Sequence, residues 1–199
     1  MRFTTSRPVR ALRSPLAALG ATCLLAATLA TPAAARAAGS DAVPFNSHGE
    51  YCTSTGGVAA RMYAWAGTNN DPSAWMQYGG KELACTYTAD DSSQITLFES
   101  TLESKKPTMA ALAYYAEVPP QGGGGGNPSL GYCVQLGGAW QIGNGLDGGG
   151  WATGRGERVY SMCVFADGSA IDAWGLLYHS ANIVRGKDLS TVLKFANPY

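Results

Sequence analysis

A seven-residue frame occurs twice in this chain, and it constrains the fold more than any other feature. The frame is Tyr-Cys, three variable residues and Gly-Gly, at residues 51–57 and 132–138. Further matches follow each copy in the same order. They pair Cys85-Thr86-Tyr87 with Cys163-Val164-Phe165, Asp91-Ser92-Ser93 with Asp167-Gly168-Ser169, Ile95 and Phe98 with Ile171 and Trp174, and residues 108–116 with 188–196. Because the order is kept and only the loop lengths differ, the sequence indicates a tandem duplication.

Between the two copies lies a segment that is unsuited to a packed helix or strand. Residues 117–126 read EVPPQGGGGG, and such a run of prolines and glycines is typical of a linker. We therefore predict a linker at residues 119–126, between a first module at 42–118 and a second module at 127–199.

Each copy of the frame predicts a short helix. Asn127 is a good N-cap residue, and Pro128 suits the first helical position because its missing N–H has no helical partner there. Gly137-Gly138 predicts the end of the helix, since glycine readily adopts the left-handed conformation found there. In the first copy Asn46 and Gly56-Gly57 predict the same start and end. Helices this short are unstable alone, so packing or a covalent link must hold them.

Strands and a last helix follow in each copy. Hairpins are predicted from residues 163–165 and 171–178, joined by an Asp-Gly turn, and from 85–87 and 94–98. An earlier strand is expected around Trp140 and Ile142, with a counterpart near Arg61 and Met62. Apolar spacing of i, i+3, i+4 and i+7 predicts helices at 109–116 and 189–196. The predicted fold is α+β: two tandem homologous α-β-β-(β)-α modules, each with a small antiparallel sheet and a C-terminal helix.

The N-terminus is typical of a secretory signal peptide. Four arginines precede an apolar run from Leu16 to Ala30, and small residues follow at 33–38. The apolar run is too short for a membrane span. We predict a signal peptide at residues 1–37 and an exported protein, periplasmic or extracellular.

Without residues 1–37 the chain is acidic. The full sequence has 14 basic and 14 acidic residues, and five of the arginines lie in the predicted signal peptide. The excess of acidic residues that remains argues against nucleic acid, which requires a cationic surface, and against an anionic membrane. No later segment is long and apolar enough to span a bilayer, so stable membrane insertion is not expected.

Four cysteines lie beyond the predicted signal peptide, namely Cys52, Cys85, Cys133 and Cys163. An even number in an exported chain predicts disulfides, but the count alone allows three pairings. A duplicated module must have been stable with its own two cysteines, which favours Cys52–Cys85 and Cys133–Cys163. Each bond would tie a short helix to its sheet and contribute roughly 3–4 kcal/mol by closing a loop of about thirty residues.

The second half resembles a known family. Asn127-Pro128, Tyr132-Cys133, Gly137-Gly138, Cys163-Val164-Phe165, Asp167-Gly168-Ser169 and Trp174 resemble a bacterial exported domain, the domain-of-unknown-function family numbered 333, which often carries a haemolysin label. The resemblance covers residues 127–178, and the first half resembles a diverged copy. The family pattern has two further cysteines, after the Asp-Gly-Ser turn and after the tryptophan, which this chain lacks. Their joint absence fits pairing within each repeat. The resemblance implies no activity.

The sequence predicts no catalytic, cofactor or metal site. A reactive cysteine needs a nearby base, and the two histidines, His48 and His179, do not recur between the copies. The loop at 143–148 fits G-x-G-x-x-G, but no helical pattern follows it. The aspartates near the turns lack the spacing of a calcium loop.

Aromatic residues are the best candidates for a ligand surface. Residues 61–80 and the region of Trp151 are expected to form long loops, in which exposed aromatic rings could bind a sugar or a protein. The candidates are Tyr63, Trp65, Trp75, Tyr78 and Trp151. Packing in the core is the alternative interpretation for each of them.

The leading functional hypothesis is therefore a non-enzymatic binding or inhibitor module, with a protein or a cell-envelope carbohydrate as its ligand. The alternative is an extracellular or envelope hydrolase with carboxylates such as Glu82, Glu157 or Asp172 between the modules. A third hypothesis, membrane lysis, lacks the cationic amphipathic helix that it would need.

Overall fold

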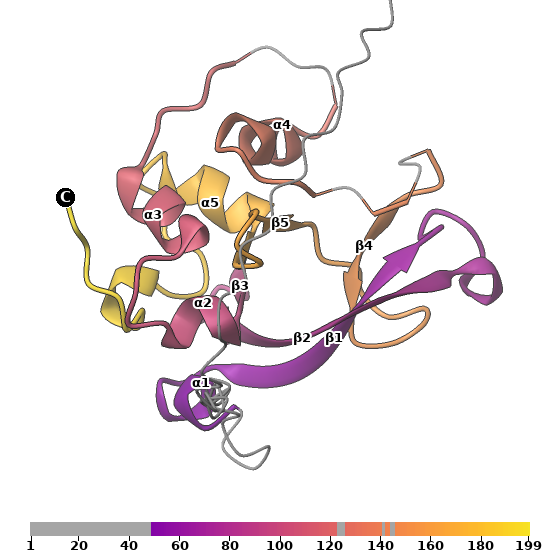
Figure 1. Cartoon of the computed structure of the whole chain (residues 1–199), viewed down its shortest axis with the longest axis horizontal. Coiled ribbons are helices and arrows are strands. Elements are labelled where there is room, and N and C mark those ends of the chain that lie inside the picture. The colour runs from indigo at the N-terminus through magenta and orange to yellow at the C-terminus, as the bar shows by residue number, and fades with distance from the viewer. Residues whose placement is uncertain (1–48, 123–125, 141, 144–145) are drawn as a thin grey trace, which may run out of the picture. The chain divides into compact units, whose positions relative to one another are not determined.

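A computed structural model describes residues 49–122, 126–140, 142–143 and 146–199, all within one compact unit, Ala42–Tyr199. The predicted signal peptide and Asn46 lie outside the described residues. The predicted helix start at Asn46 is wrong, because the first described helix begins at Glu50 with Gly49 as its N-cap. The fold is α+β, with an antiparallel sheet and helices gathered to one side of it (Figure 1). No helix of the described segments is long and apolar enough to cross a bilayer.

Each half of the chain contains both helices and strands. The first half contains α1 (Glu50–Ser54), β1 (Val58–Ala66), the 3-10 turn η1 (Pro72–Ala74), β2 (Met76–Thr88), β3 (Gln94–Phe98), α2 (Glu99–Glu103) and α3 (Met109–Ala116). The second half contains α4 (Pro128–Gln135), β4 (Gly149–Ala152), β5 (Met162–Val164), β6 (Ala170–Asp172), α5 (Ala173–His179) and the 3-10 turn η2 (Leu189–Thr191).

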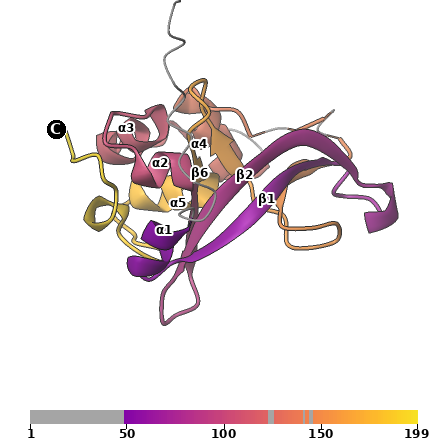
Figure 2. The same cartoon turned by 60° about the horizontal axis from the view of Figure 1, so that its bottom comes forward.

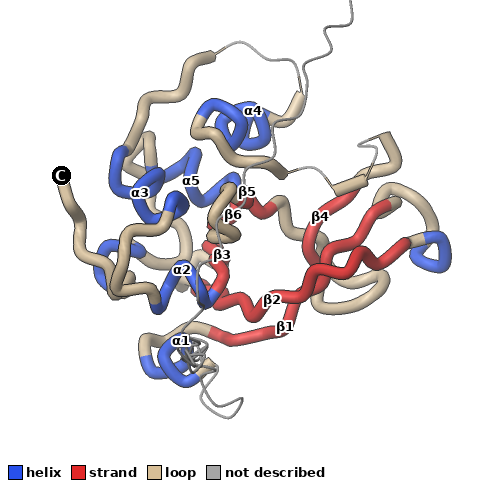
Figure 3. Tube along the Cα trace, viewed as in Figure 1, coloured by secondary structure: helices blue, strands red, loops and turns tan. Residues whose placement is uncertain are grey.

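Both halves contribute to one six-stranded sheet, in the order β4-β1-β2-β3-β6-β5. Strands of the two halves pair at two places in the sheet. Strand β3 pairs with β6 at Leu97 and Ile171, and β4 pairs with β1. The two ends of the sheet also meet, because Trp151 of β4 exchanges backbone hydrogen bonds with Tyr160, just before β5. Figure 3 shows the strands running from β4 through β1, β2 and β3 to β6 and β5.

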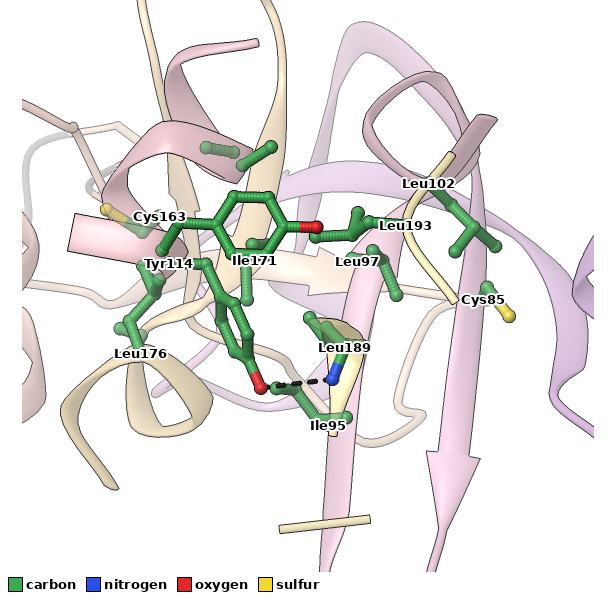
Figure 4. Close-up of a cluster of buried hydrophobic side chains, with 14 of the residues drawn as sticks. Cys85, Ile95, Leu97, Leu102, Tyr114, Cys163, Ile171, Leu176, Leu189 and Leu193 are labelled. Atoms are coloured by element: carbon green, nitrogen blue, oxygen red, sulfur yellow. Dashed lines mark hydrogen bonds between the residues drawn. The ribbon is translucent and has the colours of Figure 1, made fainter. Parts of the chain in front are cut away.

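The sheet has an apolar core on each face. The helices cover one face, on which Cys85, Leu97 and Ile171 are fully buried (Figure 4). The same cluster holds Tyr114 of α3, whose hydroxyl accepts a hydrogen bond from the backbone N–H of Leu189. A second cluster fills the opposite face, with Met62, Ala64, Ala84, Phe98, Trp151, Met162 and Ala170 as its buried members. The β1–β2 ribbon extends away from the helices (Figure 2).

The two predicted disulfides are present. Cys52 of α1 is bonded to Cys85 of β2, and Cys133 of α4 is bonded to Cys163 of β5. Each bond therefore joins the short helix of one half to a strand of the same half. Helix α4 begins as predicted, because the Asn127 side chain accepts a hydrogen bond from the backbone N–H of Ser129.

The two Gly-Gly pairs have one geometry. The first glycine of each pair, Gly56 or Gly137, is left-handed, with φ of 90° and 83°, and ends the helix. The second glycine of each pair packs directly against the sulfur atoms of the disulfide. A Cβ atom at Gly57 would lie 2.4 Å from the Cys85 sulfur, and one at Gly138 would lie 2.3 Å from the Cys163 sulfur. The pair thus turns the chain and leaves room for the bond.

The hairpin turns also match, but their strands differ in length. In each turn an N–H bonds the carbonyl four residues on, from Ala89 to Ser93 and from Phe165 to Ser169. The cysteine of each hairpin pairs with Leu97 in the first half and with Ile171 in the second. Counted from the turn, Ile171 corresponds to Ile95, as predicted, whereas counted from the cysteine it corresponds to Leu97. The first hairpin is two residues longer on each strand.

Three predicted elements of the second half differ in the structure. Strand β6 ends at Asp172, where the predicted strand 171–178 turns into α5, because the Asp172 side chain caps that helix by accepting from the N–H of Gly175. The predicted helix 189–196 is only the 3-10 turn η2, since the N–H of Lys194 bonds the carbonyl of Leu102 instead. Of the described residues around Trp140, Ala139 forms a bridge with Val164, and neither Trp140 nor Ile142 lies in a strand.

Candidate binding site

Four of the five candidate aromatic residues lie in strands instead of the expected loops, and Trp75 lies in the loop that joins β1 to β2. Residues 61–80 form most of the β1–β2 hairpin, and Trp151 lies in β4 beside it. Successive strand residues point to opposite faces of a sheet. Tyr63, Trp65 and Trp75 consequently belong to one cluster, whereas Tyr78 and Trp151 lie on the other face, around a pocket.

The first cluster is internal packing at the hairpin tip. Trp65 and Trp75 are buried and meet edge to face, with ring centroids 6.0 Å apart. The guanidinium of Arg155 lies over Trp65, 5.2 Å from the ring centroid, and donates to the carbonyls of Pro72 and Ser73. The exposed face of this cluster is therefore covered by the chain's own arginine.

On the other face, three aromatic rings line a pocket of about 410 Å³. Tyr78 comes from β2, Trp140 from the segment after α4, and Trp151 from β4. The remaining lining residues are Ala64, Ala139, Ile142, Gly143 and Val164. Trp140 is not among the predicted candidates, because the sequence predicts a strand around it.

Tertiary packing holds the rings of the pocket. Trp151 is 8% exposed and meets Phe98 edge to face, with centroids 4.8 Å apart. Its ring passes over Gly80, where a Cβ atom would lie 3.2 Å from the indole. Tyr78 is 48% exposed and Trp140 is half-buried, so both rings can reach a ligand. The pocket therefore has a fixed floor and an accessible rim.

A second hollow, of about 1020 Å³, adjoins the first and shares Trp140 with it. It lies between α4 and the start of the predicted linker, and Leu130, Val134 and Leu177 supply apolar lining. This part of the linker docks on α4: Tyr132 donates to the carbonyl of Val118, and Gln135 bonds the backbone of Pro119 and Gln121. We call this second hollow the α4 groove.

The carboxylates of the hydrolase hypothesis lie on separate elements. Asp172 accepts hydrogen bonds from the backbone N–H groups of Thr96 and Gly175. Burial raises the pKa of Asp172, and these two hydrogen bonds oppose the shift. Glu82 lies in β2, where burial raises the pKa of its carboxyl, and Glu157 lies in an exposed turn after β4. Asp172 thus has a structural role as a helix cap.

His179 is packed between acidic and aromatic neighbours. Its ring stacks on Tyr114 with centroids 3.6 Å apart, and its Nε2 lies 3.2 Å from Oε1 of Glu117. Burial lowers the pKa of His179, and the nearby carboxylates of Glu117 and Asp188 oppose the shift. In the described part of the chain, no three His, Cys, Asp or Glu side chains are placed to hold a metal ion.

The comparison with known families bears on the same half as the α4 groove. Residues 124–180 match a family model described as "Domain of unknown function (DUF333)". The second half of the chain is thus similar to DUF333. The match runs from before α4 to the end of α5 and includes the Cys133–Cys163 bond. No curated protein and no solved structure gives a significant match.

Proposed function

We propose that this protein is an exported, non-enzymatic binding module whose ligand occupies the pocket lined by Tyr78, Trp140 and Trp151. The observation that carries the proposal is the convergence of these rings from three separate segments. Pockets of this size that are lined mainly by apolar and aromatic groups are the usual form of a ligand site. Tyrosine and tryptophan are also the residues that most often dominate binding energy.

Export is supported by the signal-like N-terminus and by two disulfides, which persist in oxidising compartments. The periplasm and the extracellular medium fit these features equally well. The DUF333-like half carries one of the bonds and the first half carries the other.

We also infer that the two halves are copies of one module. Shared geometry supports this: in each half the residue after the glycine pair bridges to the residue after the strand cysteine, Val58 to Thr86 and Ala139 to Val164. The pocket lies where the copies differ. Tyr78 belongs to the long β1–β2 ribbon, and among its described residues the second half has no strand of that length.

The test measures binding of the neutral fluorescent probe N-phenyl-1-naphthylamine to the protein that cells export after expression of the full sequence. Tyr78→Ala and Trp140→Ala should each weaken binding about tenfold, which corresponds to 1.4 kcal/mol. Tyr199→Ala is the matched control, because it removes an aromatic ring that is 76% exposed and does not line this pocket. Probe binding that is absent, or that Tyr199→Ala weakens as much as the pocket variants do, would overturn the proposal.

A further inference from the structure

The pocket, of about 410 Å³, and the α4 groove, of about 1020 Å³, adjoin at Trp140, which lines both. Together they offer more space than a single ring-sized ligand fills. On this basis, and resting on the proposed function, we infer that the ligand is an extended, uncharged polypeptide segment. One apolar side chain of the segment enters the pocket, and its backbone continues along the α4 groove.

The absence of charge along the surface is the first argument. Among the described residues that line the pocket or the α4 groove, none carries a charged side chain. Buried charges without a partner are costly, so a charged segment would lose hydration here without compensation. Charge matching therefore selects an uncharged occupant.

The mixture of lining groups is the second argument. The described residues that line the pocket offer aromatic and aliphatic walls and no side-chain amide or carboxylate. It therefore suits an apolar side chain better than a sugar, whose hydroxyl groups each lose hydrogen bonds to water on burial. The α4 groove adds the amides of Asn127 and Gln135 beside the rings of Tyr132 and Trp140. Amides can pair with peptide groups and rings can pack against side chains, as in aromatic-lined grooves that bind extended peptides.

The chain itself supplies an example of this recognition. Residues 118–121 read Val-Pro-Pro-Gln and are uncharged. Tyr132 and Gln135 of α4 hold this segment through its backbone, with Tyr132 Oη 2.6 Å from the carbonyl oxygen of Val118 and Gln135 Nε2 2.9 Å from that of Pro119. Helix α4 thus already binds an uncharged, proline-containing segment at one wall of the groove. The proposed ligand lies beside it, toward Trp140.

The test uses an array of short capped peptides built from Gly, Ser, Pro and Asn around one central Phe or Leu. A matched array carries Asp at the centre. We expect binding only when the centre is apolar, and an affinity that changes less than about twofold between roughly 0.05 and 0.5 M NaCl.

Two exposed valines give matched variants of the protein. Val134 lies in the α4 groove and Val184 lies outside both hollows, and their side chains are 59% and 55% exposed. Val134→Asp therefore places a charge in the groove, and Val184→Asp places a similarly exposed charge elsewhere. Val134→Asp should weaken the best peptide at least about tenfold and leave N-phenyl-1-naphthylamine binding unchanged, because the probe needs only the pocket. Val184→Asp should change neither.

The remaining outcomes separate this inference from the proposed function. If the probe binds but no apolar-centred peptide does, the polypeptide inference fails and the binding module stands. Binding of neutral chitin or maltose oligomers in place of peptides has the same meaning. If the probe, the peptides and the sugars all fail to bind, both proposals fail.

Discussion

Gly138 lies directly on the sulfur of Cys163, and a Cβ atom at this glycine would be 2.3 Å from it. Gly57 has the same relationship to Cys85, at 2.4 Å. The sulfur belongs to a disulfide and cannot rotate away, so a methyl group here would force the helix and the strand apart.

We therefore expect Gly138→Ala to destabilise the protein by about 1–3 kcal/mol, the usual cost of overpacking a core. Gly131→Ala is the control: it lies in α4 with no atom within 4 Å of the added Cβ, and alanine favours helix. Its stability should stay the same or rise by up to about 1 kcal/mol. Urea unfolding measures both changes, and equal midpoints for Gly138→Ala and wild type would refute the packing argument.

The two disulfides should contribute similar free energies of unfolding. They close loops of similar length, with sequence separations of 33 and 30 residues. Replacing either pair with alanines is expected to cost roughly 3–4 kcal/mol, mainly through the larger entropy of the unfolded chain. Denaturant unfolding of the Cys52→Ala/Cys85→Ala and Cys133→Ala/Cys163→Ala variants measures this. A variant as stable as the wild type would contradict the expectation.

Acid should destabilise the fold partly through His179. Its pKa in the folded protein is lowered, chiefly by burial, so the unfolded chain binds the proton more readily. The contribution is complete above the unfolded value of about 6.5 and is lost as the pH falls below it. His179→Gln should therefore flatten the dependence of unfolding free energy on pH between about 5 and 7. An NMR titration that gives His179 a pKa above its usual value would reverse the sign and contradict this prediction.

Asp172 should prove structural. Its carboxylate oxygens accept from the N–H groups of Thr96 and Gly175 at 2.8 and 2.7 Å, which links β3 to the start of α5. Asp172→Ala removes a helix cap and leaves a strand N–H unpaired, so we expect a loss of about 1–3 kcal/mol. Asp188→Ala, which removes the cap of the short turn η2, is the comparison and should cost less. Thermal unfolding measures both, and an unchanged midpoint for Asp172→Ala would exclude the capping role.

Local signals were sufficient for several elements. Asn127, Pro128 and the glycine pair mark both ends of α4 because caps and left-handed glycines act within one turn. The spacing from Met109 to Ala116 predicts α3 for a similar reason. By contrast, the apolar run at 171–178 fits a buried strand and a buried helix equally well, and periodicity alone does not separate them.

The sequence by itself determined the disulfide pairing and the short helix that carries the first cysteine of each bond, because these depend on a pattern of residues that recurs in the chain. The tertiary structure decided that both halves share one sheet, and which aromatic rings are accessible. Trp151 faces Ala64 across the β1–β4 pair. That register, set by pairing between distant segments, brings Tyr78, Trp140 and Trp151 to one pocket and sends Trp65 to the opposite face.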